Sequence, residues 1–294
     1  MKRSPLLLAA ALLLAAPARA DEESDAAAEH EARAQKMLSD SLVDAMAMLE
    51  HGSEAAKEQA ARSVAQLAIE TTISQPFHPV TFRNACVRAG IIKQLASLLK
   101  DPNATPTSYL HALHALEAIA TDDPTTDMDN GHAQAVCSTG VCPTVVSFLA
   151  SADEALQVSA ARCAAILAED PQCQQMLVRA KAVDALVFLG TYGNDMAKMH
   201  AVAALDLLRL NNVAASKQIR ESGGMQMLSG LKQYGLGGLR DLVSEQLDSL
   251  QKPSAVVQAT VEPTAHVKQA HLQRVKHSKM WESVGVRRAY APPQ

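Results

Sequence analysis

Apolar residues recur along the chain in segments whose three- and four-residue spacing is that of one helix face. The pattern occurs in three clear copies, residues 90–99, 140–149 and 181–190. A degraded copy follows at 223–231, and a weaker early copy begins at Asp40. Successive copies start 50, 50, 41 and 42 residues apart. One apolar column contains Leu95, Val145, Leu186 and Leu228. Recurrence at this period indicates a helical repeat protein.

A longer segment rich in Ala and Leu accompanies each copy, and a short apolar segment precedes it. The long segments lie near 60–68, 112–120, 160–168 and 201–208. The sequence therefore predicts a repeating unit of short helix, turn, helix, loop and long helix. Gly90, Gly140 and Gly223 stand at the first turn, where glycine adopts the positive φ that ends a helix at little cost.

These columns resemble the armadillo repeat family. The resemblance rests on Glu58-Gln59-Ala60-Ala61 and on the run from Ala89 to Leu99, and it covers residues 34–250. It implies an all-α, right-handed superhelical solenoid of about four to five armadillo-type repeats, in which stacked neighbours bury one continuous core. It also implies a protein that is not an enzyme and that binds other proteins along the concave surface of its long helices.

Residues 1–20 match a secretory signal peptide, with Lys2 and Arg3, an apolar run and the small-residue end Ala18-Arg19-Ala20. The apolar run is shorter than the roughly 20 residues that span a bilayer. After it we expect an acidic N-terminal segment at 21–33, the repeat domain at 34–250 and a basic C-terminal tail at 251–294 with one helix. The predicted location is the secretory pathway, in the ER lumen or outside the cell, or the periplasm of a bacterium.

Charge narrows the range of partners. The predicted signal peptide contains the basic residues Lys2, Arg3 and Arg19. Without them the mature chain has 24 basic and 31 acidic residues, a formal charge of −7. This balance argues against nucleic acid as a partner. No later apolar run is long enough for stable membrane insertion after signal cleavage. The expected partner is therefore another protein.

Motifs that carry catalysis or bind cofactors are not found. The sequence has no nucleophile elbow, phosphate loop or zincin motif, so no catalytic residue, cofactor or metal site is predicted. His111 and His114 share a helix face, but no further ligand is evident. The loop Asp127-x-Asp129-Asn130-Gly131 has Ser138 where a calcium loop needs its closing Glu.

Two modifications follow from an oxidising compartment. Of the five cysteines, Cys137 and Cys142 flank the Gly140 turn and form one candidate disulfide, and Cys163 with Cys173 forms a second. The other interpretation is that Cys86 and Cys142, which lie in apolar columns, are buried free thiols. Asn103-Ala104-Thr105 is an N-glycosylation sequon in a predicted loop, so Asn103 is a candidate glycan site.

The groove departs from that of peptide-binding members of the family, whose long helices repeat Trp and, four residues on, Asn. The Trp positions fall here on Arg62, His114, Arg162 and Ala203. The Asn positions fall on Gln66, Ala118, Ile166 and Leu207. The candidate partner-binding residues are therefore Arg62, Gln66, His114 and Arg162. Because arginine pairs well with carboxylates, we expect an acidic partner segment.

The resulting prediction is a non-enzymatic scaffold or adaptor of the secretory pathway. An alternative is an ER-lumenal co-chaperone that resembles the armadillo-type nucleotide exchange factors of Hsp70 proteins. Two units are longer than the others by about ten residues, in loops near 71–79 and 121–131. A metal-dependent enzyme built on these loops is a further alternative.

Overall fold

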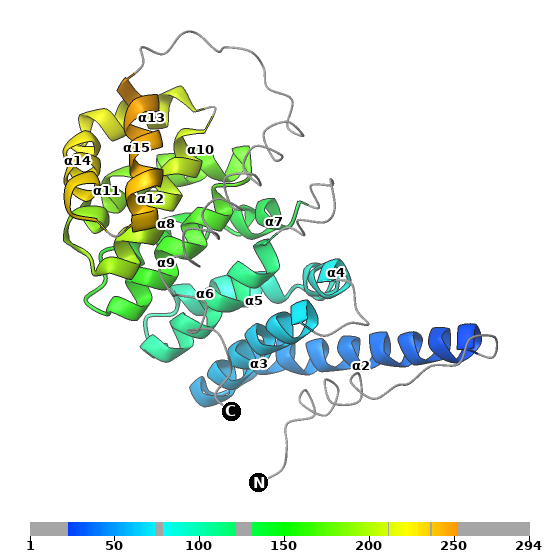
Figure 1. Ribbon diagram of the computed structural model, residues 1–294. Coiled ribbons are helices and arrows are strands. Elements are labelled where there is room, and N and C mark those ends of the chain that lie inside the picture. Colours follow the sequence, from blue (N-terminus) through cyan, green and yellow to red (C-terminus); the bar gives the residue numbers. More distant parts are fainter. Residues whose placement is uncertain (1–22, 74–78, 122–130, 211, 236, 252–294) are drawn as a thin grey trace. The chain divides into compact units, whose positions relative to one another are not determined.

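The computed structural model describes residues 23–73, 79–121, 131–210, 212–235 and 237–251. These residues form 14 helices and no strands, as the repeat pattern predicts (Figure 1). The predicted signal peptide, the loop Asp127–Asn130 and the tail beyond Gln251 lie outside the described residues.

The described helices fall into two compact units. The first contains α2 (Glu23–His51), α3 (Glu54–Ile73), α4 (Pro79–Ala89), α5 (Ile91–Lys100), α6 (Pro106–Ala120) and α7 (His132–Ser138). The second contains α8 (Cys142–Phe148), α9 (Glu154–Leu167), α10 (Pro171–Arg179), α11 (Ala182–Tyr192), α12 (Asp195–Arg209), α13 (Val213–Glu221), α14 (Gly224–Tyr234) and α15 (Gly237–Gln251). In the first unit α3 packs along α6, and in the second α9 packs along α12.

The predicted apolar columns form the core. Leu95, Val145, Leu186 and Leu228 are fully buried, each on the middle helix of its repeat. The long helix α12 is buried almost all round, because nearly every residue from Ala197 to Leu208 is apolar or covered. A helix that is apolar on every side belongs in a core between neighbouring helices.

The turn before each middle helix has the predicted left-handed backbone. The φ angles are 75° at Gly90, 70° at Gly140 and 84° at Gly223. In the third copy Lys181 takes the same conformation, with φ 65°, and is the one described non-glycine residue with positive φ. The repeat therefore imposes this backbone even where its sequence lacks glycine.

The first helix is longer than the weak repeat copy at Asp40 suggests. Helix α2 begins at Glu23, so it includes most of the acidic segment expected at 21–33. The run between Ala26 and Ala34 is rich in alanine and glutamate, which have high helix propensity and extend the helix toward the N-terminus.

Replacing Lys181 by glycine is expected to stabilise the fold. Lysine in the left-handed region costs about 1–2 kcal/mol, which glycine avoids, although glycine also loses more backbone entropy on folding. We expect the free energy of unfolding, measured by urea denaturation, to rise by about 0.5–1 kcal/mol. The reverse change Gly140→Lys should lower it, and equal stability of all three proteins would contradict the assignment.

Candidate protein-binding surface

Arg62 of α3 reaches across to α6 in the first unit. Its Nε donates a hydrogen bond of 3.1 Å to Nε2 of His111. One Nη lies 3.6 Å from a carboxylate oxygen of Glu58, one helical turn earlier. The Arg62 side chain is nevertheless 51% exposed. These contacts orient the guanidinium and leave its outer edge open to solvent.

Glu58 ties this surface to the start of α6. Its carboxylate accepts hydrogen bonds from the Thr105 hydroxyl at 2.9 Å and the Ser108 hydroxyl at 3.4 Å. Thr105 also caps α6, because its Oγ1 accepts a bond from the backbone N–H of Ser108. The carboxylate beside Arg62 is therefore held by the helix cap rather than by Arg62 alone.

Lys57 fixes the opposite edge of the same surface. Its ammonium group contacts Glu54 at 2.9 Å and Asp101 at 3.2 Å. The hydrogen bond to Glu54, which has the larger effect, and the hydrogen bond to Asp101 both raise the pKa of Lys57. The hydrogen bond from the backbone N–H of Asn103, which has the larger effect, and the hydrogen bond from Lys57 both lower the pKa of the Asp101 carboxyl. Both groups stay charged near neutral pH, and the loop before α6 is anchored to α3.

His111 is neutral at physiological pH. Burial of the ring, which has the larger effect, and the positive charge of Arg62 both lower the pKa of His111. The negative charge of Glu58 acts in the opposite direction. Since Nε2 accepts the Arg62 hydrogen bond, the ring proton is on Nδ1. Protonation of Nε2 would break this bond and place two positive charges together.

The structure brings three of the four predicted binding residues into the first unit. Arg62 and Gln66 lie one turn apart on α3, and half-buried His114 lies on α6. Both Gln66 and His114 have interactions within the protein. Arg162 differs, because its side chain in α9 of the second unit is only 8% exposed and already has an interaction within the protein. Arg162 is therefore much less exposed than Arg62, and its role in partner binding stays a prediction.

His111 is the residue whose role the sequence misplaced. Spacing pairs it with His114, three residues on, whereas the structure pairs it with Arg62, 49 positions away. The repeat register could have found this contact, since α3 and α6 are successive long helices. Among the described residues, no group of three or more His, Cys, Asp or Glu side chains is arranged to hold a metal ion.

The predicted glycan site lies at the edge of this surface. Asn103 is exposed in the turn between α5 and α6, and its backbone N–H donates to Asp101. Thr105, the third sequon residue, is the N-cap of α6. Attachment of a glycan remains a prediction, and its position would place the sugar beside the start of α6.

The cysteine pairings expected from spacing are wrong. Cys86, Cys142 and Cys163 are buried and form no disulfide, so neither Cys137–Cys142 nor Cys163–Cys173 forms. Cys137 and Cys173 are both disulfide-bonded. Cys142 is fully covered in its apolar column, where a thiol behaves as a small hydrophobe. Burial raises the pKa of Cys142 to about 11 and also raises that of Cys86.

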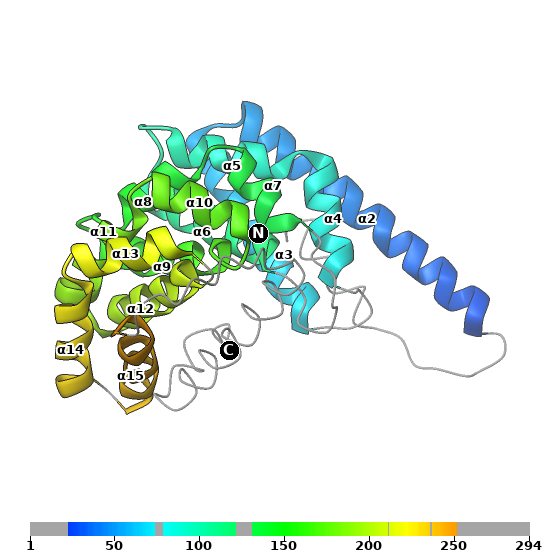
Figure 2. The same cartoon turned by 90° about the horizontal axis from the view of Figure 1, so that it is seen from above.

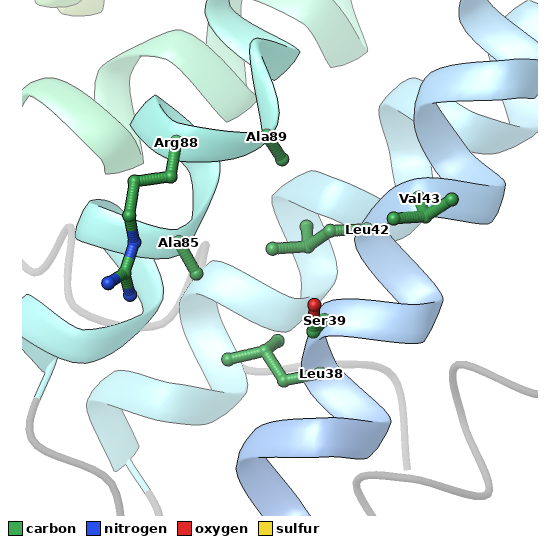
Figure 3. A pocket seen from close by; sticks show the side chains of 7 residues that line it. All are labelled: Leu38, Ser39, Leu42, Val43, Ala85, Arg88 and Ala89. Atoms are coloured by element: carbon green, nitrogen blue, oxygen red, sulfur yellow. The ribbon is translucent and has the colours of Figure 1, made fainter.

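A separate pocket of about 620 Å³ opens between α2 and α4 (Figure 3). Leu38 and Leu42 of α2 point toward α4, and Ala85 and Ala89 of α4 point back toward α2. Ser39, Val43 and Arg88 complete the lining. The lining combines apolar side chains with the polar Ser39 and Arg88. The repeat pattern did not predict this pocket, because α2 belongs to the weakest copy.

No described helix is both long and apolar enough to cross a membrane. No protein-family model matches the sequence, and no curated protein matches it.

Solved structures with armadillo repeats do match the fold. A designed armadillo repeat protein in complex with the peptide (KR)4 has a TM-score of 0.60 at 19% identity, over 84% of this chain and 100% of that one. A computationally designed armadillo repeat protein for modular peptide recognition has a TM-score of 0.62 at 19% identity, over 83% and 99%. The armadillo-repeats-only protein of Plasmodium falciparum has a TM-score of 0.54 at 18% identity, over 65% and 80%. The chain therefore has the predicted all-α, armadillo-type repeat fold.

Protonation of His111 is expected to destabilise the protein below neutral pH. Because the pKa of His111 is lowered in the folded state, the unfolded chain takes up this proton first as the pH falls. The His111 contribution is complete above the ordinary histidine pKa of about 6.5 and is lost as the pH falls toward the lower folded value. His111→Gln should therefore flatten the decline in free energy of unfolding between about pH 7 and pH 5. The control variant His51→Gln changes an exposed histidine and should show the same decline as the wild type. Identical pH profiles for His111→Gln and the wild type would contradict the destabilising effect of His111 protonation.

Thiol labelling should separate the two classes of cysteine. In the native protein the buried thiols should react slowly with iodoacetamide, because the thiolate is the reactive form. The denatured, unreduced chain should take up three alkyl groups, at Cys86, Cys142 and Cys163. After reduction it should take up five, as counted by intact mass. Labelling at Cys137 or Cys173 before reduction would contradict the assignment.

Proposed function

We propose that this armadillo-type protein is a non-enzymatic scaffold or adaptor that binds another protein through the α3–α6 surface of its first unit. The observation that carries the proposal is the fold, which this chain shares with designed proteins made for peptide recognition. A likeness of fold supports binding in general, and the choice of surface rests on the side chains themselves.

Arg62 favours an acidic partner segment. Its guanidinium is half exposed and is held in place by His111 and Glu58 before any partner arrives. A donor that is already oriented loses less side-chain entropy on binding. Arginine also matches a carboxylate with two parallel hydrogen bonds, which gives both affinity and orientation.

Gln66 lies one turn after Arg62 on the exposed side of α3. An amide both donates and accepts hydrogen bonds, so it suits the backbone of an extended partner. We place the partner side chain at Arg62 and its backbone at Gln66. His114 of α6 borders the same surface and contributes contact area.

The proposed compartment is the secretory pathway, either the ER lumen or the cell exterior, or the periplasm in a bacterium. The signal-peptide pattern at residues 1–20 supports it. The disulfide-bonded state of Cys137 and Cys173 also supports it, because structural disulfides persist in oxidising compartments.

Charge reversal at Arg62 tests the surface. An extended acidic peptide carrying a fluorophore should bind the wild-type mature protein, as measured by fluorescence anisotropy. Arg62→Glu should weaken binding about tenfold or more, which corresponds to about 1.4 kcal/mol. The matched control Arg179→Glu changes an exposed arginine of α10 in the second unit and should change affinity far less. Equal losses in both variants would show that only net charge matters, and the proposed surface would be wrong.

A further inference from the structure

Three exposed aromatic rings lie on α11 and α14, two helices of the second unit that contact each other. Phe188 is 55% exposed, Tyr192 is 74% exposed and Tyr234 is 79% exposed. The rings of Phe188 and Tyr192 are in contact, with centroids 4.9 Å apart. Only 3% of the chain is aromatic, so three such rings in solvent on two packed helices are not explained by composition.

The two tyrosines occupy the same position of successive repeats. Each is the last residue of its helix, and the glycine that follows donates its N–H to a leucine carbonyl, at 2.8 Å for Gly193 and 2.7 Å for Gly235. Helices α11 and α14 lie side by side in both views (Figures 1 and 2). Gly190 permits this approach, since a Cβ there would lie 2.9 Å from Sδ of Met227. The tyrosines therefore occupy equivalent exposed positions on neighbouring helices.

Two carboxylates flank the rings. Exposed Asp184 lies one turn before Phe188 and accepts hydrogen bonds from the neutral groups of Gln218 and Ser222. Exposed Asp195 begins α12, three residues after Tyr192. Within the described part of the chain, neither carboxylate has a salt-bridge partner. Aromatic faces beside unneutralised carboxylates suit arginine and lysine, which stack on rings and pair with acids.

The chain itself supplies a segment of matching charge. Residues 21–251 contain 17 basic and 29 acidic residues, whereas residues 252–294 contain 7 basic and 2 acidic ones. The basic segment leaves from the end of α15, which packs against α14 and α12 in the same unit. Its extended length, at about 3.3 Å or more per residue, is ample to reach any face of that unit.

We propose that the face formed by Asp184, Phe188, Tyr192, Asp195 and Tyr234, the aromatic face, binds the basic segment 252–294 of the same chain. Arginine and lysine side chains stack on the exposed rings, and the two aspartates neutralise them. This contact is independent of the α3–α6 surface. It covers apolar area on the second unit and offsets the acidic charge of the repeats.

Tryptophan fluorescence of the full mature chain tests the proposal directly, because the only tryptophan, Trp281, lies in the basic segment. Docking should protect Trp281 from acrylamide and shift its emission to the blue. Loss of a single exposed cation–π contact corresponds to about a two- to fivefold weaker equilibrium. The double variant Phe188→Ser with Tyr192→Ser should therefore raise the quenching constant toward that of the denatured chain.

Two further variants separate the aromatic from the acidic contribution. Asp184→Asn with Asp195→Asn should also raise quenching, and it keeps the side-chain shape. In the wild type, about 1 M salt should have the same effect, since the Debye length then falls to about 3 Å. The controls Val213→Ser and Glu221→Gln change exposed residues of α13 outside the aromatic face and should leave quenching as in the wild type. Unchanged helical circular dichroism verifies that each variant is folded.

Two results would overturn the proposal. The first is a Trp281 quenching constant that is the same in the wild type and in both face variants. The second is protection that disappears on dilution of the protein, because the segment would then bind a second copy instead of its own chain. Protection that is independent of concentration and is lost in both face variants supports it.

Discussion

The packing of one long helix against the next is the contact on which the other features depend. In the first unit α3 lies along α6, and in the second α9 lies along α12. Small residues permit this, since Ala60, Ala61 and Ala112 are fully buried and let the helix backbones approach closely. No single repeat covers its own apolar face, so each helix owes its stability to its neighbours. The side chains at the rims of these contacts form the surfaces available for binding.

The candidate binding surface shows how this packing organises charge. Glu58 is held by the hydroxyl groups that begin α6, and Lys57 is held by Asp101 just before that helix. Arg62 is thus flanked by groups whose positions are set by the docking of α6 on α3. Side chains that folding has already ordered lose little further conformational entropy when a partner binds. The same dependence means that a mutation in the α3–α6 core would also disturb Arg62.

Periodicity predicted the parts of the structure that repeat. The buried column through Leu95 and Leu186 and the left-handed turns at Gly90 and Gly223 recur in register, so several weak signals add. Individual side-chain contacts do not recur. The Arg62–His111 bond joins residues from two helices, and the burial of Arg162 depends on the helices around α9. The predicted cysteine pairs were wrong for the same reason, since spacing in the chain does not measure distance in space.

Folding shields the three cysteines that form no disulfide from reaction. Cys86, Cys142 and Cys163 are inert while buried, because a covered thiol does not reach a disulfide, and burial also raises the pKa of Cys86 and Cys142. Opening of the surrounding helices would expose thiols in a molecule that also contains disulfide-bonded cysteines. Thiol–disulfide exchange would then lock the chain into mispaired forms that cannot refold. For this molecule the rate of unfolding, rather than the equilibrium free energy, would set its lifetime under oxidising conditions.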